Sequence, residues 1–295
     1  IQLWFQEKNL GKKDYKIISL LDVGDFIGVK GVVVKTKTGQ ISIDVESLAV
    51  LSKSLRPLPD SWHGFKDIEE RYRKRYLDLL INDEARWALQ KRSLIVQEMR
   101  NFLDKQGFLE VETPTLQPLY GGASARPFVT HHNALDADLY LKISDELYLK
   151  RLIIGGFEKV YEIGKCFRNE GVDRVHNPDF TMLEFYWAFA DYKDMMKLTE
   201  RMFSFVLKKV FGKLEIEYED KKINFKTPWQ RIEFSQLFRK YTKINLDEIN
   251  QSGLYRKAKE LGVLVEPELP KAEIADEIYK KFCRSKIWQP SFILH

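Results

Sequence analysis

The side chains best suited to chemistry lie between residues 160 and 189. Two strand-like runs, 160–170 and 179–189, flank a polar connection at 171–178 and predict an antiparallel hairpin with a long loop. Because side chains alternate along a strand, one face of this hairpin would carry Cys166, Arg168, Glu170, Phe180, Met182, Glu184 and Tyr186. The other face, formed by Thr181, Leu183, Phe185 and Trp187, is mainly apolar. An arginine and two glutamates in the middle of a sheet indicate either a ligand site or a structural ion cluster across the hairpin.

The elements that must position this hairpin begin with a long amphipathic helix, predicted over 84–106 and ending at Gly107, a usual C-terminal stop. The helix leads into a strand that Pro114 closes. A helix that only packs on a sheet of its own chain would show the same sequence pattern, so the pattern alone assigns no further role to the helix.

Two further stretches precede the hairpin. The loop 121–128 reads GGASARPF, and its glycines would let the backbone approach a ligand closely, although most Gly-Gly pairs are only turns. Ser144 is a candidate N-cap for a helix that extends to Ile154. Glu146 falls in the first turn of that helix, where the helix dipole favours a carboxylate, so a capping role would be sufficient for it.

Composition indicates an ordinary globular protein. A length of 295 residues with 44% apolar content suggests two domains, and no apolar run is long enough to span a membrane. A net charge of +5 permits RNA binding without demonstrating it. Two cysteines and no Cys/His cluster at metal-ligand spacing fit a reducing, cytoplasmic location and exclude a structural zinc site. The chain begins with Ile1 directly in a strand pattern, so we expect further sequence upstream.

The two predicted domains differ in pattern. Residues 1–56 read as strands with one helical stretch and suggest part of an OB-type β-barrel, a fold that often binds oligonucleotides. Prolines and a glycine mark a linker at 57–66, and residues 67–295 form the second, mixed domain.

The residue order in the hairpin resembles a known motif. F-R-N-E, a short loop, and then H-N-P-D-F-T-M-L-E resemble the second signature motif of class II aminoacyl-tRNA synthetases, in particular the lysine-specific branch, and the loop GGASARPF is similar as well. The resemblance implies an α+β fold in which a partial OB-type anticodon-binding barrel precedes a catalytic domain with a mainly antiparallel sheet flanked by helices. It also implies ATP-dependent activation of L-lysine to lysyl-adenylate and transfer to tRNA(Lys).

The resemblance assigns roles to individual residues. It implies that Arg168 is the catalytic residue, since the family's arginine grips the α-phosphate of ATP and the amino-acid carboxylate, and that Phe180 stacks on adenine. The full ATP-binding set would be Arg168, Glu170, His176, Asn177 and Phe180. The lysine-binding set would be Gly122, Glu146, Arg168, Glu184 and Tyr186.

Two positions depart from the family pattern. The family usually has an arginine immediately before the loop histidine, where this chain has Val175 preceded by Arg174. Asp179 replaces the usual glutamate, which is a milder change.

The resemblance also implies a homodimer, built on the 84–106 helix and the strand after it, and a magnesium cofactor. The magnesium ligands and the third signature motif would follow residue 295, so we expect no metal ligand within this chain. The charged stretch 68–83 is either a solvated helix face or a surface that faces tRNA. A non-catalytic fragment or paralogue that acts as a binding or dimerisation protein is the alternative function, while the aspartate and asparagine enzymes fit the motifs less well.

Overall fold

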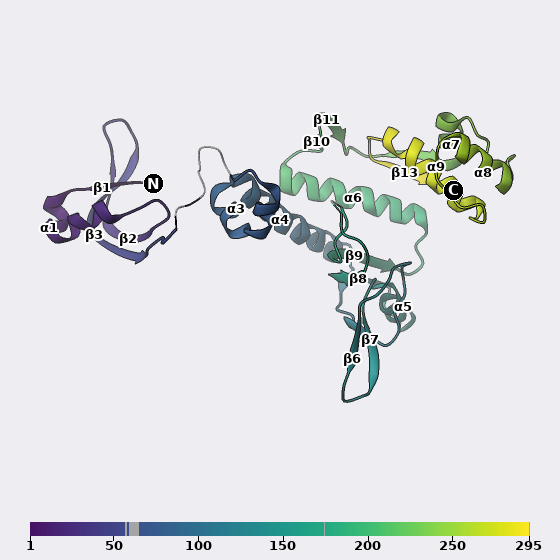
Figure 1. Ribbon diagram of the computed structural model, residues 1–295, viewed down its shortest axis with the longest axis horizontal. Coiled ribbons are helices and arrows are strands. Elements are labelled where there is room, and N and C mark those ends of the chain that lie inside the picture. The colour runs from purple at the N-terminus through teal and green to yellow at the C-terminus, as the bar shows by residue number, and fades with distance from the viewer. Residues whose placement is uncertain (57, 59–64, 174, 295) are drawn as a thin grey trace. The chain divides into compact units, whose positions relative to one another are not determined.

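The computed structural model describes residues 1–56, 58, 65–173 and 175–294. The chain divides into two compact units, Ile1–Gln90 and Lys91–His295, which Figure 1 colours from purple to blue and from blue to yellow. Helices and mixed sheets together confirm the predicted α+β class. Of the predicted linker 57–66, all but residues 58, 65 and 66 lie outside the described residues.

The first unit opens with a small three-stranded sheet. Its elements are β1 (Gln2–Phe5), α1 (Glu7–Ile17), the 3-10 helix η1 (Ile18–Leu20), β2 (Phe26–Lys35) and β3 (Ile41–Ser52). The central strand β3 pairs parallel with β1 and antiparallel with β2. Leu10 of α1 packs with Val45 and Leu48 of β3 to form its core.

The predicted single helix over 68–83 is two short helices. They are α2 (Ile68–Arg73) and α3 (Arg75–Ile81), and the chain breaks between them at Lys74, whose φ of −113° and ψ of 52° are not helical. The side chain of Asp67 accepts a hydrogen bond from the Glu70 backbone N–H and caps α2. The break lets α3 change direction, which periodicity alone does not reveal.

The second unit is built on the sheet β4-β8-β9. The helix α4 (Asp83–Lys105) precedes it and, as predicted, is followed by Gly107 in a left-handed conformation with φ of 79°. The predicted strand after Gly107 is only the two residues of β4 (Leu109–Glu110), which pair parallel with β8 (Lys159–Phe167). The antiparallel partner of β8 is β9 (Asp179–Trp187), so the predicted hairpin is confirmed.

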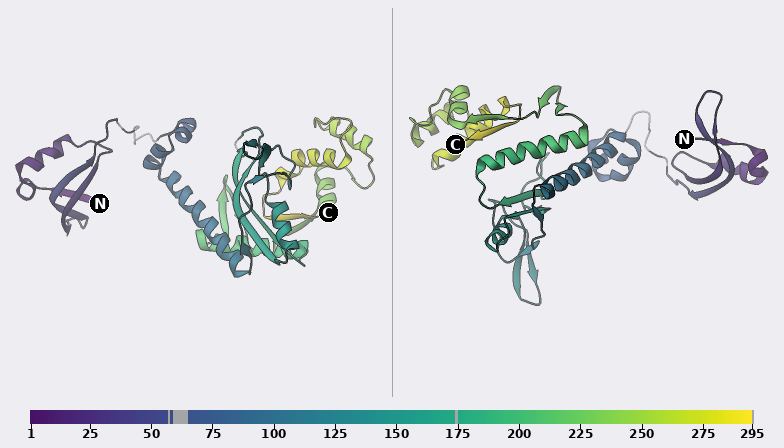
Figure 2. Two further views of the ribbon diagram at one scale, coloured as in Figure 1. Left: turned by 90° about the horizontal axis from the view of Figure 1, so that it is seen from below. Right: turned by 180° about the vertical axis from the view of Figure 1, so that it is seen from behind.

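The apolar face of the hairpin is covered by helices. Leu183, Phe185 and Trp187 of β9 pack with α4 and with α6 (Tyr192–Phe211) around a core that includes Leu103, Tyr161 and Met202. The opposite face of β8 and β9 contacts α5 (Glu146–Ile154). Figures 1 and 2 show α5 and α6 on opposite sides of the strands. Glu184 of β9 therefore lies between the sheet and the start of α5.

A second antiparallel sheet supports the segment in front of α5. Its strands are β5 (Leu116–Gln117), β6 (Val129–His132) and β7 (Ala137–Leu141), in the order β5-β7-β6. The loop 121–128 connects β5 to β6, and β7 runs directly into the residues that begin α5.

The remaining elements form a helical body after α6. They are the hairpin β10 (Glu215–Tyr218) and β11 (Lys221–Asn224), then β12 (Gln230–Glu233), α7 (Phe234–Thr242), α8 (Gln251–Glu260), α9 (Lys271–Phe282), the 3-10 helix η2 (Arg284–Lys286) and β13 (Ser291–Leu294). The strands β12 and β13 pair parallel. Phe238, Leu254, Ile278 and the buried thiol of Cys283 lie in the core of this body. None of the helices in the described ranges has the length and apolar character that a membrane span requires.

Candidate active site

The strand β8 ends at Phe167, so Arg168 and Glu170 lie just beyond it rather than on its face. This corrects the predicted strand, which extended to residue 170. The Arg168 backbone N–H still donates to the Pro178 carbonyl over 2.9 Å and keeps the two chain segments together for one more residue. Cys166, the last inward-facing residue of the strand, is buried opposite Phe180.

The guanidinium of Arg168 lies over the Phe180 ring, with Cζ 5.1 Å from the ring centroid. Its Nε and Nη2 both lie 3.4 Å from the Ile143 carbonyl oxygen, which is at the long limit for a hydrogen bond. Among the described residues it forms no ion pair with a carboxylate, so the structural ion cluster considered from the sequence is not formed. A guanidinium held in this way can still bind an anion with its planar fork.

A cavity of about 200 Å³ lies at the open end of the hairpin. It is lined by Arg168, Glu170, Gly171, Val175, His176, Asn177 and Phe180. The structure thus brings together all five residues that the sequence resemblance assigned to ATP.

The loop beside this cavity is organised by Asp173, a residue that the sequence analysis did not single out. Its Oδ1 accepts backbone hydrogen bonds from Val175 and His176, and its Oδ2 lies 2.8 Å from His176 Nδ1. The backbone hydrogen bond from Val175 and the contact with His176 lower the pKa of the Asp173 carboxyl. An acidic residue three positions before a loop histidine is the signal that could have found it. Arg174, which precedes Val175 where the family pattern has its arginine one position later, lies outside the described residues.

Glu184 is held by three donors on the inner face of the hairpin. Its Oε1 accepts from the Ser144 hydroxyl over 2.6 Å and from the Asp145 backbone N–H over 3.0 Å. Its Oε2 accepts from the Tyr186 hydroxyl over 3.2 Å. Burial, and then the nearby charges of Glu184 and Glu146, raise the pKa of Tyr186, so this hydroxyl stays protonated and acts as the donor.

Ser144 is not the N-cap of α5. That position belongs to Asp145, whose side chain makes no capping hydrogen bond, while Ser144 Oγ lies 3.2 Å from the Glu146 backbone nitrogen that donates to it. The correction has a physical reason: the Ser144 hydroxyl proton is used by Glu184, so the residue joins the start of α5 to the sheet. The Glu146 carboxylate forms an ion pair with Lys150, over 2.5 Å, rather than capping the helix.

Gly122 is packed against these residues in a conformation that favours glycine. Its φ is +86°, and a Cβ placed on it would lie 2.7 Å from Ser144 Oγ and 2.8 Å from Glu146 Cβ. Farther along the same loop, the Asn169 backbone N–H donates to the Arg126 carbonyl over 2.7 Å. The glycine loop, the start of α5 and the end of β8 therefore meet around one site.

Beneath the site lies a buried ion network that the sequence analysis missed. Lys142 Nζ is 2.8 Å from Asp145 Oδ1 and 2.5 Å from Glu162 Oε1, and the side chains of all three residues are at most 5% exposed. Burial opposes the charge on Lys142, but its hydrogen bonds to Asp145 and Glu162 outweigh burial and raise its pKa. Burial raises the pKa of the Asp145 carboxyl, and its Oδ2 has no hydrogen-bond partner among the described residues. Glu162 falls on the same alternating face as Glu184, which is the signal that could have found it.

Comparison with known proteins decides the family. Residues 67–293 match the model of the class II tRNA synthetases (D, K and N). The chain belongs to this family.

Curated relatives of this class II tRNA synthetase chain include three lysine–tRNA ligases. That of Syntrophomonas wolfei is 49% identical over 294 residues, which cover 99% of this chain and 60% of the relative. That of Clostridium botulinum strain Langeland is 49% identical over 297 residues, with 99% and 59% covered. That of Carboxydothermus hydrogenoformans is 50% identical over 295 residues, with 100% and 60% covered. The chain thus spans about 60% of the length of the curated relatives that it matches.

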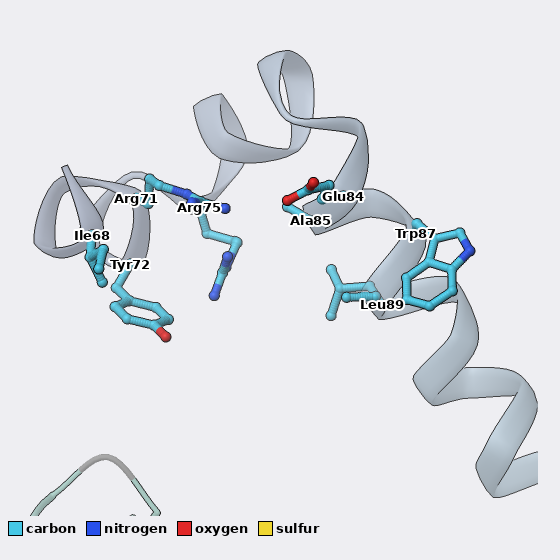
Figure 3. A pocket seen from close by; sticks show the side chains of 9 residues that line it. Ile68, Arg71, Tyr72, Arg75, Glu84, Ala85, Trp87 and Leu89 are labelled. Carbon is cyan, nitrogen blue, oxygen red and sulfur yellow. The ribbon is translucent and has the colours of Figure 1, made fainter. Parts of the chain in front are cut away.

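The synthetase chain has another cavity, of about 640 Å³, in its first unit among α2, α3 and the start of α4. Figure 3 shows Tyr72, Trp87 and Leu89 among its lining side chains. Asp78 is fully buried nearby and pairs with both Arg71 and Arg75. These two arginines neutralise the charge of a buried carboxylate, so part of the basic character of 68–83 serves to stabilise the fold.

Proposed function

We propose that this protein is a lysine–tRNA ligase, which activates L-lysine with ATP and transfers the lysyl group to tRNA(Lys). The observation that carries the proposal joins two features: an Arg168 guanidinium that contacts Ile143 and has no carboxylate partner among the described residues, and a half-buried Glu184–Tyr186 pair held by the adjacent Ser144. The first suits a phosphate and a carboxylate, and the second suits an ammonium group. The similarity to curated lysine–tRNA ligases supports the same substrates.

The chemistry needs positioning more than proton transfer. The carboxylate of lysine is ionised at neutral pH and attacks the α-phosphorus of ATP, which forms a carboxyl–phosphate bond and releases pyrophosphate. Arg168 would bridge the attacking carboxylate and an α-phosphate oxygen and neutralise their charge as they approach. Its planar fork is suited to two oxygens at once, whereas a lysine offers a point charge.

Phe180 would stack on adenine, directly below the guanidinium that holds the phosphate. Glu170, His176 and Asn177 line the same cavity and would contact the rest of ATP. The hydrogen bonds from Asp173 fix the backbone that carries His176, which would reduce the entropy lost when the loop closes on a ligand.

Lysine would lie between α5 and the hairpin. Glu146 would bind its α-ammonium group, with the backbone at Gly122 close beside it. Glu184 and Tyr186 would bind the ε-ammonium group, because a desolvated ammonium needs acceptors whose own hydrogen bonds hold them in place. An amino acid whose side chain lacks this ammonium group would leave those acceptors unpaired, which predicts strong selection for lysine.

Magnesium, tRNA and a second subunit complete the proposal. In the part of the chain that the structure describes, no three or more His, Cys, Asp or Glu side chains form a cluster that could hold a metal. We further propose a homodimer, a cytoplasmic location, an OB-type domain at 1–56 with a linker at 57–66, and a catalytic domain at 67–295.

The test is lysine-dependent exchange between ATP and pyrophosphate, followed by aminoacylation of tRNA(Lys), with the full-length protein. Exchange with lysine but not with aspartate or asparagine supports the proposal. Absence of exchange with all three amino acids would favour the non-catalytic binding protein instead.

A further inference from the structure

One side of α7 carries a stripe of basic residues. Gln236, Arg239 and Lys240 follow the spacing i, i+3 and i+4, which places them on the same side of the helix. Lys243 follows directly as the C-cap, with a φ of 62°. The opposite side is buried in the core through Leu237 and Phe238. The stripe is therefore outward-facing and separate from the hairpin site.

Two adjoining grooves open along this stripe. One, of about 560 Å³, includes Gln236 and Lys240 of α7 together with Lys286 and Trp288. The other, of about 400 Å³, is lined by Gln236, Arg239, Lys240 and Lys243. Because they share two lining residues, they form one surface, which we call the α7 groove. No acidic side chain lines it among the described residues.

The cations of the α7 groove differ from other lysines of the same body. In the described parts of the chain, no ion pair is found for Arg239, Lys240, Lys243 or Lys286. By contrast, Lys257 of α8 pairs with Glu260 over 2.6 Å, and Lys280 of α9 pairs with Asp276 over 2.8 Å. The helix dipole stabilises cations near the C-terminal end of a helix, which explains why Arg239 and Lys240 occur in the last turn of α7. It does not explain Lys286, which lies in the short 3-10 helix η2.

The rim of the groove adds an aromatic surface and a further cation. Trp288 is 38% exposed as a residue, and Lys221 Nζ lies 3.0 Å from the centroid of its ring. The cations of the groove come from separate elements: Arg239 and Lys240 from α7, Lys243 from its C-cap, and Lys286 from η2. Cations supplied along one groove by separate elements suit successive phosphates of a chain better than one small anion.

We propose that the α7 groove binds the phosphodiester backbone of RNA. The identity of that RNA as tRNA rests on the proposed function, and the groove adds a contact surface outside the site of amino-acid activation. Backbone contacts of this kind contribute affinity that depends on salt and carry little sequence preference.

The test uses the full-length protein with Arg239, Lys240 and Lys243 all replaced by Ala. The matched control replaces Lys197, Lys257 and Lys280 by Ala, which removes the same charge from lysines that form ion pairs. Both variants are compared for tRNA affinity as a function of salt, for KM of tRNA in aminoacylation, and for lysine-dependent pyrophosphate exchange, which needs no tRNA.

We expect the groove variant to bind tRNA about tenfold more weakly or worse, with exchange unchanged. The slope of log K against log salt should fall in magnitude by about 2 to 3, because each phosphate contact contributes about 0.7 to 0.9. A variant with Arg239→Lys, Lys240→Arg and Lys243→Arg should retain binding, which guards against a folding defect.

Equal tRNA affinity and equal salt slope in the groove variant and the control would overturn the inference. An equal loss of exchange and of tRNA affinity would overturn it as well, since the surface would then act through the activation site. If the wild-type protein bound tRNA through the groove but showed no pyrophosphate exchange, that result would contradict the proposed function and still support RNA binding by the α7 groove.

Discussion

The Tyr186 hydroxyl donates to Glu184 Oε2 over 3.2 Å, while two donors from the start of α5 occupy Oε1 of the same carboxylate. Glu184 is thus fixed in place but keeps acceptor capacity on the Tyr186 side, because a carboxylate oxygen can accept two hydrogen bonds. The predictions below test this pocket and the elements that support it.

Replacing Tyr186 with Phe should raise KM for lysine about 10-fold or more and leave KM for ATP nearly unchanged. The change removes the hydroxyl beside Glu184 without altering the volume of the ring, so an ammonium loses a partner while the nucleotide cavity is intact. Pyrophosphate exchange at varied lysine and varied ATP separates the two constants. Tyr218→Phe, at an exposed tyrosine, is the control, and an equal rise in both constants would indicate a packing defect instead.

Replacing Arg168 with Lys should reduce the rate of exchange by about 10²-fold or more, because a point charge cannot bridge a carboxylate and a phosphate. The melting temperature should stay within a few degrees of the wild-type value, since the hydrogen bonds of the guanidinium within the described ranges are two long ones to the Ile143 carbonyl. Arg92→Lys, at an exposed arginine that donates to Thr181, is the matched control. Near-normal exchange in the Arg168 variant would remove this residue from the catalytic site.

Replacing Gly122 with Ala should weaken lysine binding as well as stability, whereas Gly212→Ala should reduce stability alone. Both glycines have a positive φ, so both variants lose about 1 kcal/mol of stability through backbone strain. At Gly122 the new Cβ would meet Ser144 and Glu146, whereas no described residue lies within 4 Å of a Cβ on Gly212. Thermal unfolding and KM for lysine are the measurements. An unchanged KM in the Gly122 variant would contradict close packing of the loop at the lysine site.

Replacing Lys142 with Met should destabilise the protein by about 3–5 kcal/mol, because it leaves the buried carboxylates of Asp145 and Glu162 without their cation. Lys165→Met, which breaks the exposed pair with Asp179, should cost less than about 1 kcal/mol. Denaturant unfolding of both variants gives the comparison. Equal effects would mean that the buried network contributes no more than a surface pair.

The cost of Lys142→Met should shrink as the pH falls. The pKa of Asp145 is raised in the folded protein, so its protonated form favours folding, and that stability is lost as pH rises through the folded pKa. Removing the cation raises this pKa further, which widens the pH range in which acid stabilises the variant relative to wild type. Unfolding free energies at neutral and mildly acidic pH would show this, and a constant difference between the two proteins would contradict it.

Sequence reasoning was most successful where alternation decides the face of a strand. Leu183, Phe185 and Trp187 pack under α4 and α6 while Glu184 and Tyr186 face α5, because burial of apolar side chains fixes the register of β9. It was less successful at element ends. The strand β8 stops at Phe167, and the helical stretch at 68–83 breaks at Lys74. The sequence did not predict these two ends because neither position carries a proline or glycine.

The polar network could not be derived from the sequence for a different reason. Lys142 and Asp145 lie on the connection between β7 and α5, whereas Glu162 lies in β8, and only the fold brings this carboxylate to Lys142. Ser144 appeared as a simple cap because its short side chain is typical of that role, while its contact with Glu184 spans 40 positions in the sequence.

The burial of both cysteines gives the protein two internal reporters of local opening. Burial raises the pKa of the Cys166 thiol to about 12, and burial also raises that of Cys283, so neither should react with an alkylating reagent in the native state. Cys166 lies beneath the hairpin site and Cys283 in the core of α7, α8 and α9. The rate at which each thiol becomes labelled would therefore follow the opening of one core independently of the other, and bound ATP and lysine should slow labelling at Cys166 more than at Cys283.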